Sequence, residues 1–255
     1  TYGMMFSSKG REKVRLAKGE AENKPVSVVA NLEDSIQWID MSQVHPDFRD
    51  VREIRKLGNM LTNVGFLRFP ANTEGKSLSA YAIDKGQLQV LFKDRGDIVL
   101  EELKHYGMPA YLVTSLNPHG ELERYQPHLA YQFAQDINAM AFVLQTPHFE
   151  QALLAKTQDA YIDSRKKRGS VPIIQLPRNS DVNPYTGAPI LTISRAANTH
   201  PYSVERVLKE VFPNAAVRYN PDKPEPKGRP QYSLPSEARG NLKTILYQAS
   251  FPLEK

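Results

Sequence analysis

The chain contains no cysteine, and its hydrophobic residues never form a long uninterrupted run. The absence of cysteine excludes disulfide-based scaffolds, thiolate zinc sites and a cysteine nucleophile. Because no run approaches the roughly 18 apolar residues of a membrane-spanning helix, the sequence predicts no transmembrane segment. Hydrophobic residues still make up 40% of the chain, which is enough to build a conventional buried core.

Catalytic and metal-binding motifs are also missing. The chain has no Gly-x-Ser-x-Gly sequence of a serine hydrolase, and no two histidines have the i, i+4 spacing of a zinc-binding helix. We therefore predict neither a metal ion nor a cofactor. Glycine is scarcer than proline, at 14 against 19 residues, which favours long and stiff connections.

Alternating strand and helix patterns predict a mixed α/β fold. We expect a helix that opens at Asp47 and ends at Gly65, because apolar residues recur there at intervals of three and four. A hairpin is expected at 80–92, around Asp84-Lys85-Gly86. Further helices are predicted at 97–106, 126–144, 148–167 and 204–212. Further strands are predicted at 26–30, 36–41, 110–116, 171–176, 189–194, 215–219 and 242–250.

Changes in composition and in hydrophobic periodicity divide the chain into three parts. Residues 1–25 are polar and basic with little periodicity, and we interpret them as an arm that is ordered only when something binds it. Residues 26–169 form a mixed α/β region that ends in a helical hairpin, and residues 170–255 form a C-terminal α/β subdomain of β-α-β-β order. The chain begins at Thr1 rather than methionine, so a leader removed before this residue is compatible with the sequence.

Positive charge is concentrated in three places. The net charge of the chain is only +5, yet residues 165–168 alone carry +4 and residues 1–18 another +4. A third basic segment covers residues 218–243, and the remainder of the chain is therefore net acidic. Such clustering favours a polyanion or an acidic partner.

The basic run Arg165-Lys166-Lys167-Arg168 has three interpretations. It can contact the phosphates of a nucleic acid, with an affinity that falls as salt rises. It can instead complement the dipole of the last turn of a helix that ends at Gly169. A nuclear-localisation signal is the third interpretation.

The proline-rich stretch at 219–239 is longer than a plain connection between two strands needs. Lys227 and Arg229 are candidates for phosphate contacts, and Tyr219 or Tyr232 for stacking on a base. A protein-binding arm and an ordinary surface loop are the alternatives.

The loop at 195–203 follows a predicted strand and precedes a predicted helix. Unpaired N–H groups at a helix N-terminus attract anions. His200 could then act as a general acid or base, with Arg195 stabilising developing negative charge. The alternative is that these residues only cap the helix and form the turn.

The charge clusters and the missing catalytic motifs favour a non-catalytic, nucleic-acid-binding or structural subunit of a nucleoprotein assembly. Its partners would be DNA or RNA, and other protein subunits contacted through 1–25 and 219–239. We expect a cytoplasmic location or one within a nucleoprotein particle, and no membrane. The alternative is a phosphodiester- or nucleotide-processing enzyme that uses Arg195 and His200.

Overall fold

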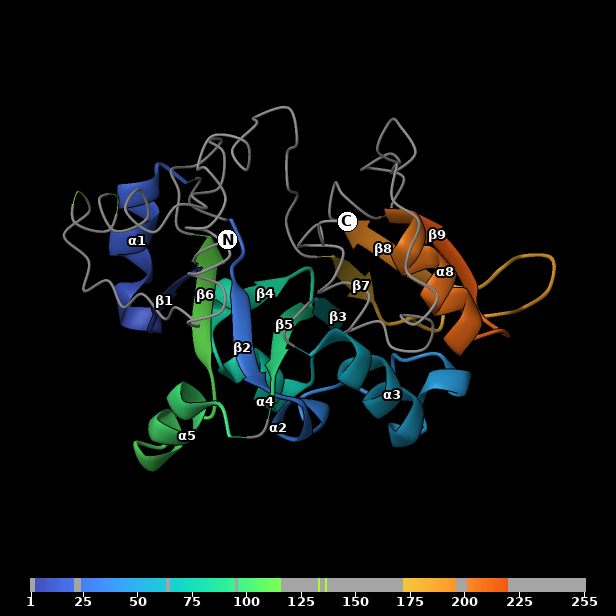
Figure 1. Ribbon diagram of the computed structural model, residues 1–255, viewed down its shortest axis with the longest axis horizontal. Helices are drawn as coiled ribbons and strands as arrows, with labels where there is room; N and C mark the ends of the chain where they lie inside the picture. Colours follow the sequence, from blue (N-terminus) through green and yellow to red (C-terminus); the bar gives the residue numbers. More distant parts are fainter. Residues whose placement is uncertain are drawn as a thin grey trace, which may run out of the picture. The chain divides into compact units, whose positions relative to one another are not determined.

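Two compact units make up the chain. One lies within Thr1–Val26 and Leu112–Lys167, and the other within Ser27–Tyr111 and Arg168–Lys255. The structure, a computed structural model, describes residues 3–20, 24–62, 65–94, 96–115, 133, 136, 172–195 and 201–219 (Figure 1). Within these residues, no helix is long and apolar enough to cross a membrane.

The first unit contains regular structure where none was expected. Strand β1 (Gly3–Phe6) pairs antiparallel with β6 (Tyr111–Ser115). A 3-10 turn, η1 (Ser8–Gly10), leads into helix α1 (Arg11–Lys18). The helix ends at Gly19, whose φ of 64° is the left-handed conformation that glycine adopts at little cost. The expectation that the first 25 residues lack structure of their own is therefore wrong for residues 3–18.

The second unit is built on a mixed sheet. Its main strands, in spatial order, are β2 (Ser27–Asn31), β5 (Gln87–Lys93), β3 (Phe66–Pro70), β7 (Ile173–Gln175), β8 (Ile190–Arg195) and β9 (Ala216–Tyr219). The pairs β2–β5, β3–β7 and β8–β9 are parallel, whereas β3–β5 and β7–β8 are antiparallel. The short β4 (Ile83–Asp84) pairs with β5. The predicted mixed α/β class is confirmed.

The core of this unit lies on one face of the sheet. Val90, Leu67, Ile174 and Ile193 are aligned across four adjacent strands, and none is more than 1% exposed. Helices α2 (Leu32–Ile36) and α3 (Val51–Leu61) contact β5 and each other, and α8 (Pro201–Val211) contacts β9. Burial of such aligned apolar side chains is the main stabilising term of the sheet.

Several predicted elements are confirmed. Lys85 and Gly86 have φ values of 50° and 77° at the turn between β4 and β5, as the hairpin requires. Helix α5 (Ile98–His105) starts after Asp97, whose carboxylate accepts from the Leu100 N–H. Strands β6, β7, β8 and β9 lie within two residues of their predicted bounds.

Other predictions need correction. The strand expected at 36–41 is absent, because Asn31 caps α2 by accepting from the Asp34 N–H and the chain turns instead. Helix α3 starts after Asp50, not Asp47; Asp47 lies in the 3-10 turn η2 (Pro46–Phe48). Strand β3, helix α4 (Thr73–Ser77) and the turn η3 (Ala80–Ala82) were not predicted. Apart from residues 133 and 136, the helices predicted at 126–167 lie outside the described residues, as does the strand at 242–250.

A substitution at Gly75 tests how closely helix α4 packs against the chain around Trp38. A Cβ atom added there would lie 2.8 Å from the Trp38 carbonyl oxygen, which the Asn72 N–H already uses as an acceptor. Because backbone cannot yield as a side-chain tip can, we expect Gly75→Ala to lower the free energy of unfolding by about 1–3 kcal/mol, despite alanine's better helix propensity. Urea denaturation measures this effect, with Lys76→Ala on the same helix as the control. A stabilised Gly75→Ala variant would contradict the packing described.

Candidate anion-binding site

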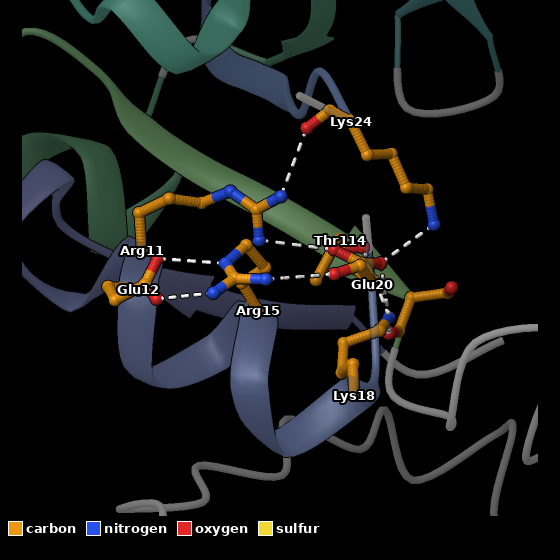
Figure 2. A network of polar contacts seen from close by, with 8 residues as sticks. Arg11, Glu12, Arg15, Lys18, Glu20, Lys24 and Thr114 are labelled. Atoms are coloured by element: carbon orange, nitrogen blue, oxygen red, sulfur yellow. Dashed lines mark hydrogen bonds and ion pairs between the residues drawn. The ribbon is translucent and has the colours of Figure 1, made fainter. Parts of the chain in front are cut away.

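Helix α1 and the segment after it bring four charged side chains together, three of them buried (Figure 2). Arg11, Lys18 and Glu20 are only 1–3% exposed, and the Lys24 side chain is 38% exposed. Positions 11, 14 and 18 share one helix face, with Val14 also buried. The inward face of this helix therefore carries two cations and one apolar residue.

The Glu20 carboxylate is the centre of this cluster. Arg11 Nη1 donates to Glu20 Oε2 at 3.1 Å, and Lys24 Nζ donates to Oε1 at 2.7 Å. Lys18 Nζ lies 3.5 Å from the same Oε1. Arg11 Nη2 also donates to the Lys24 carbonyl at 3.0 Å, which closes the segment back onto the helix.

Lys18 connects the cluster to strand β6. Its ammonium group donates to Thr114 Oγ1 at 3.1 Å and to the Ser115 carbonyl oxygen. These contacts link residues nearly a hundred positions apart in the sequence, so they fix α1 against β6 within the first unit. The amine is held by two neutral oxygens and one carboxylate.

Three cations of the cluster share one carboxylate. Arg11, Lys18 and Lys24 all lie within 3.5 Å of Glu20, and Arg11 and Lys18 are almost fully buried with it. The neighbouring Arg15 forms an exposed pair with Glu12, at 2.8 and 2.5 Å, and also donates to the Glu20 carbonyl at 3.3 Å. Buried charges of this kind are stable only when they are paired and hydrogen-bonded.

The environment shifts the pKa values of two of these groups. Burial lowers the pKa of Lys18 to about 8, and Lys24 and Arg11 act in the same direction, while Glu20 opposes them. For the pKa of Glu20, the neighbouring charges have a larger effect than burial. Burial alone would raise its pKa, but the hydrogen bond from Lys24 and the charges of Lys18, Lys24 and Arg11 outweigh burial and lower it. Glu20 is therefore ionised at neutral pH.

One donor of the cluster is unused. The Arg11 Nε atom is buried and has no hydrogen-bond partner, although the two terminal nitrogens of the same guanidinium are paired. Buried donors are nearly always satisfied, so an unpaired one needs an explanation. A ligand oxygen at this position would satisfy the Arg11 Nε–H.

The second unit contains the loop that sequence reasoning selected. Strand β8, helix α8 and parallel strand β9 form a β-α-β unit, so the segment after Arg195 leads from the carboxyl end of a strand to a helix N-terminus. Arg195 is the last residue of β8 rather than the residue after it. His200 lies outside the described residues, and the pairing of Arg195 with His200 stays a prediction.

Polar residues cross this sheet in one line. Gln89, Arg68, Gln175, Thr192 and Arg218 are register partners on five adjacent strands. Arg218 Nε donates to Thr192 Oγ1 at 3.1 Å. At the end of β8, the Ser194 hydroxyl is buried without a hydrogen-bond partner. These five polar residues therefore form one row on the sheet face opposite Leu67 and Ile174. Within the described residues, no group of three or more acidic or histidine side chains is arranged to hold a metal ion.

Most of the predicted site residues cannot be compared with the structure. Arg165, Lys166, Lys167, Arg168, Lys227, Arg229 and Tyr232 all lie outside the described residues, and they stay predictions. Of the basic opening segment, Arg11 and Lys18 are brought together, but Lys9 is exposed. Sequence reasoning missed Glu20 and Lys24 as site residues; the spacing of Arg11, Val14 and Lys18 on one helix face was the available signal.

Comparisons with known proteins identify the fold but not a family. No family model matches the chain, and no curated protein matches its sequence. A hypothetical protein of Streptococcus mutans UA159, smu.1377c, has a similar structure, with a TM-score of 0.53, 14% identity and coverage of 86% of both chains. Sua5 of P. abyssi, in complex with L-threonine, has a TM-score of 0.51 and 13% identity over 85% of this chain. The match covers 52% of the Sua5 chain, so this chain spans about half its length. At these identities the likeness shows a shared α/β fold alone.

The lowered pKa of Lys18 gives a testable pH dependence. Between about pH 8 and the ordinary value of 10.5, the unfolded chain keeps a proton on Lys18 that the folded chain has released. Stability contributed by this residue therefore rises with pH in this window. We expect the difference in unfolding free energy between the wild type and Lys18→Met to shift in favour of the wild type, by up to about 1.4 kcal/mol per pH unit.

Urea denaturation at pH 7.5, 9 and 10 measures this difference. Arg15→Met on the same helix is the control, because a guanidinium stays charged throughout this range. A difference for Lys18→Met that is constant, or that moves against the wild type, would contradict the buried position of this amine.

Proposed function

We propose that the chain is an enzyme of the phosphate-ester- or nucleotide-processing class, which binds an anionic group of its substrate at Arg11, Lys18 and Lys24. The observation that carries the proposal is the buried Arg11 guanidinium, whose Nε–H has no acceptor. Arg11, Lys18 and Lys24 share one carboxylate beside it. An oxoanion would supply the missing acceptor.

The exposure of the four side chains indicates how an anion reaches them. Lys24 is the only one of the four that is substantially exposed, and its Nζ lies 2.7 Å from Glu20. A ligand would meet Lys24 first and then compete with Glu20 for Arg11 and Lys18. Anionic groups of phosphates and of carboxylates both suit such donors, and Sua5, which shares the fold, is seen in complex with L-threonine.

Removal of the Lys24 ammonium tests the site. Hydrogen bonds to charged groups contribute about 1.5–3 kcal/mol, so Lys24→Met should weaken the binding of inorganic phosphate by roughly 10- to 100-fold. Isothermal titration calorimetry at low salt measures the affinity. Arg52→Met removes one exposed cation from α3 and should leave the affinity unchanged. Equal phosphate affinity in Lys24→Met and the wild type would refute the site.

Turnover separates an enzyme from a binding protein. Phosphorus NMR of ATP or a phosphodiester incubated with the protein should show a new product resonance, lost in Lys24→Met. In this proposal Arg195 and His200 remain the candidates for charge stabilisation and proton transfer, so His200→Ala should fold normally and lose turnover. A chain that binds phosphate but converts none of these compounds would not be an enzyme of this class.

Nucleic-acid binding by a subunit of a larger assembly is the second candidate function, favoured by the concentration of charge in residues 165–168 and 218–243. Replacing Arg165, Lys166, Lys167 and Arg168 by alanine should weaken binding to short DNA or RNA. It should also flatten the salt dependence of binding, because fewer phosphate contacts release fewer counterions. Fluorescence anisotropy from 50 to 300 mM salt is the measurement. An unchanged affinity and slope would remove these residues from the interface.

A further inference from the structure

Exposed apolar side chains gather on helix α5 and the turn that follows it (green in Figure 1). Of the seven large hydrophobic side chains that are exposed in the described part of the chain, Ile98, Tyr106 and Met108 lie within 98–108. Ile98 is 85% exposed and Tyr106 is 72% exposed, and Leu100 is the only buried residue of the helix. Single exposed apolar residues are ordinary, whereas a group of them marks an interaction surface.

The inward face of α5 is held by a few contacts. Leu100 is buried, and one turn later Lys104 Nζ lies 3.3 Å from Asp34 Oδ2 on α2. The Asp97 carboxylate accepts from the Leu100 N–H at 3.2 Å, which caps the start of the helix. At the other end, the Met108 N–H donates to the carbonyl of Leu103 at 3.0 Å. The helix is therefore fixed in place without any use of its outer face.

The outer face is apolar and has one carboxylate in its middle. Ile98, Glu102 and Tyr106 follow one another at intervals of four residues, so they lie along one side of the helix, and all three are exposed. Val99 and Leu103, which are half-buried, flank this row. These five residues are called the α5 face below. An apolar row of this kind is the pattern by which one helix packs against another.

The charge of the α5 face selects among the possible partners. Glu102 lies at its centre with the half-exposed Glu101 beside it, and the Lys104 ammonium is directed at Asp34 and Glu101. A two-fold pairing with α5 of a second copy would place Glu102 against Glu102, and like charges oppose association. An anionic lipid surface is disfavoured for the same reason. A partner helix with a cation opposite Glu102 satisfies both the apolar row and the charge.

We propose that the α5 face binds an amphipathic helix of a partner protein, with apolar residues against Ile98 and Tyr106 and a lysine or arginine against Glu102. Burial of the apolar side chains provides the affinity, and the carboxylate discriminates against acidic partners. The surface belongs to the second unit and shares no residue with the anion cluster on α1, so this inference is independent of the proposed function.

Binding of a defined peptide tests the surface. The probe is a fluorescent peptide of about 14 residues, built from leucine and lysine at helical spacing. A second peptide has glutamate in place of every lysine. Fluorescence anisotropy should show saturable binding of the lysine peptide to the whole chain, and at least about tenfold weaker binding of the glutamate peptide.

Substitutions locate the binding on α5. The double variant Ile98→Ser with Tyr106→Ser should bind the lysine peptide at least about tenfold more weakly, because the apolar contacts are lost. Glu102→Lys should weaken binding at least about threefold at low salt, and the effect should disappear at about 1 M salt. The controls are Tyr185→Ser, at a tyrosine that is 94% exposed, and Glu74→Lys on α4; both should stay within about twofold of the wild type. Since all these side chains are exposed, every variant should keep the thermal unfolding transition of the wild type.

Four results would overturn the proposal. The first is an absence of saturable binding, or equal binding of the lysine peptide to the wild type and to the double variant. The second is equal affinity for the two peptides, which would remove the role of Glu102. The third is a wild-type dimer in sedimentation velocity that the double variant dissociates, which would assign the α5 face to a second copy. The fourth is cosedimentation with vesicles of phosphatidylcholine and phosphatidylglycerol that the double variant loses, which would assign the face to lipid.

Discussion

Ion pairs that leave water need compensation at every atom, and the Arg11–Glu20 pair is the contact around which helix α1 and its described neighbours are organised. The guanidinium lies on α1, the carboxylate follows the helix by two residues, and Lys24 completes the cluster from the next segment. Lys18 links this cluster to β6 by hydrogen bonds to Thr114 and Ser115. Removing one partner of such a buried pair usually costs 3–5 kcal/mol, because the other charge stays behind unpaired. The helix, the segment after it and the strand therefore depend on the same few atoms.

This organisation also explains why the cluster suits a ligand better than a purely structural role. Hydrophobic packing could fix α1 at lower cost, since apolar residues pay no desolvation penalty. The chain instead buries Arg11 and Lys18 against one carboxylate and leaves the Arg11 Nε–H without an acceptor. In the proposed function, this arrangement gains energy from one more anion. The donors are also held in place before the ligand arrives, which reduces the entropy lost on binding.

Much of the second unit could be predicted from the sequence, because there hydrophobic periodicity coincides with burial. Val204, Val207 and Leu208 recur at helical spacing, and all three are at most 2% exposed in α8. The sequence Asp84-Lys85-Gly86 predicts the hairpin because its residues tolerate the positive φ values that the turn requires. Strand β3 was missed because Arg68 and Pro70 break the apolar pattern, although Leu67 and Phe69 are fully buried.

The candidate site could not be predicted in the same way. Pattern reasoning assigns charged residues to the solvent-facing side of a helix, whereas Arg11 and Lys18 point inward on α1. Their burial depends on Glu20 and on the carbonyl of Ser115, which is distant in sequence and enters only through the pairing of β1 with β6. Clusters of positive charge are visible in a sequence, but the partners that allow cations to be buried are not.

The most direct test of an anion site is the unpaired donor itself. Arginine Nε–Hε resonances are resolved in nitrogen-15 correlation spectra, and Arg11→Lys would assign the signal of Arg11 by its disappearance. Titration with inorganic phosphate should shift the Arg11 signal to saturation, with the exposed Arg52 signal nearly unchanged. An Arg11 signal that stays fixed while phosphate binds, or that moves no more than that of Arg52, would show that the buried cluster is not where the anion is held.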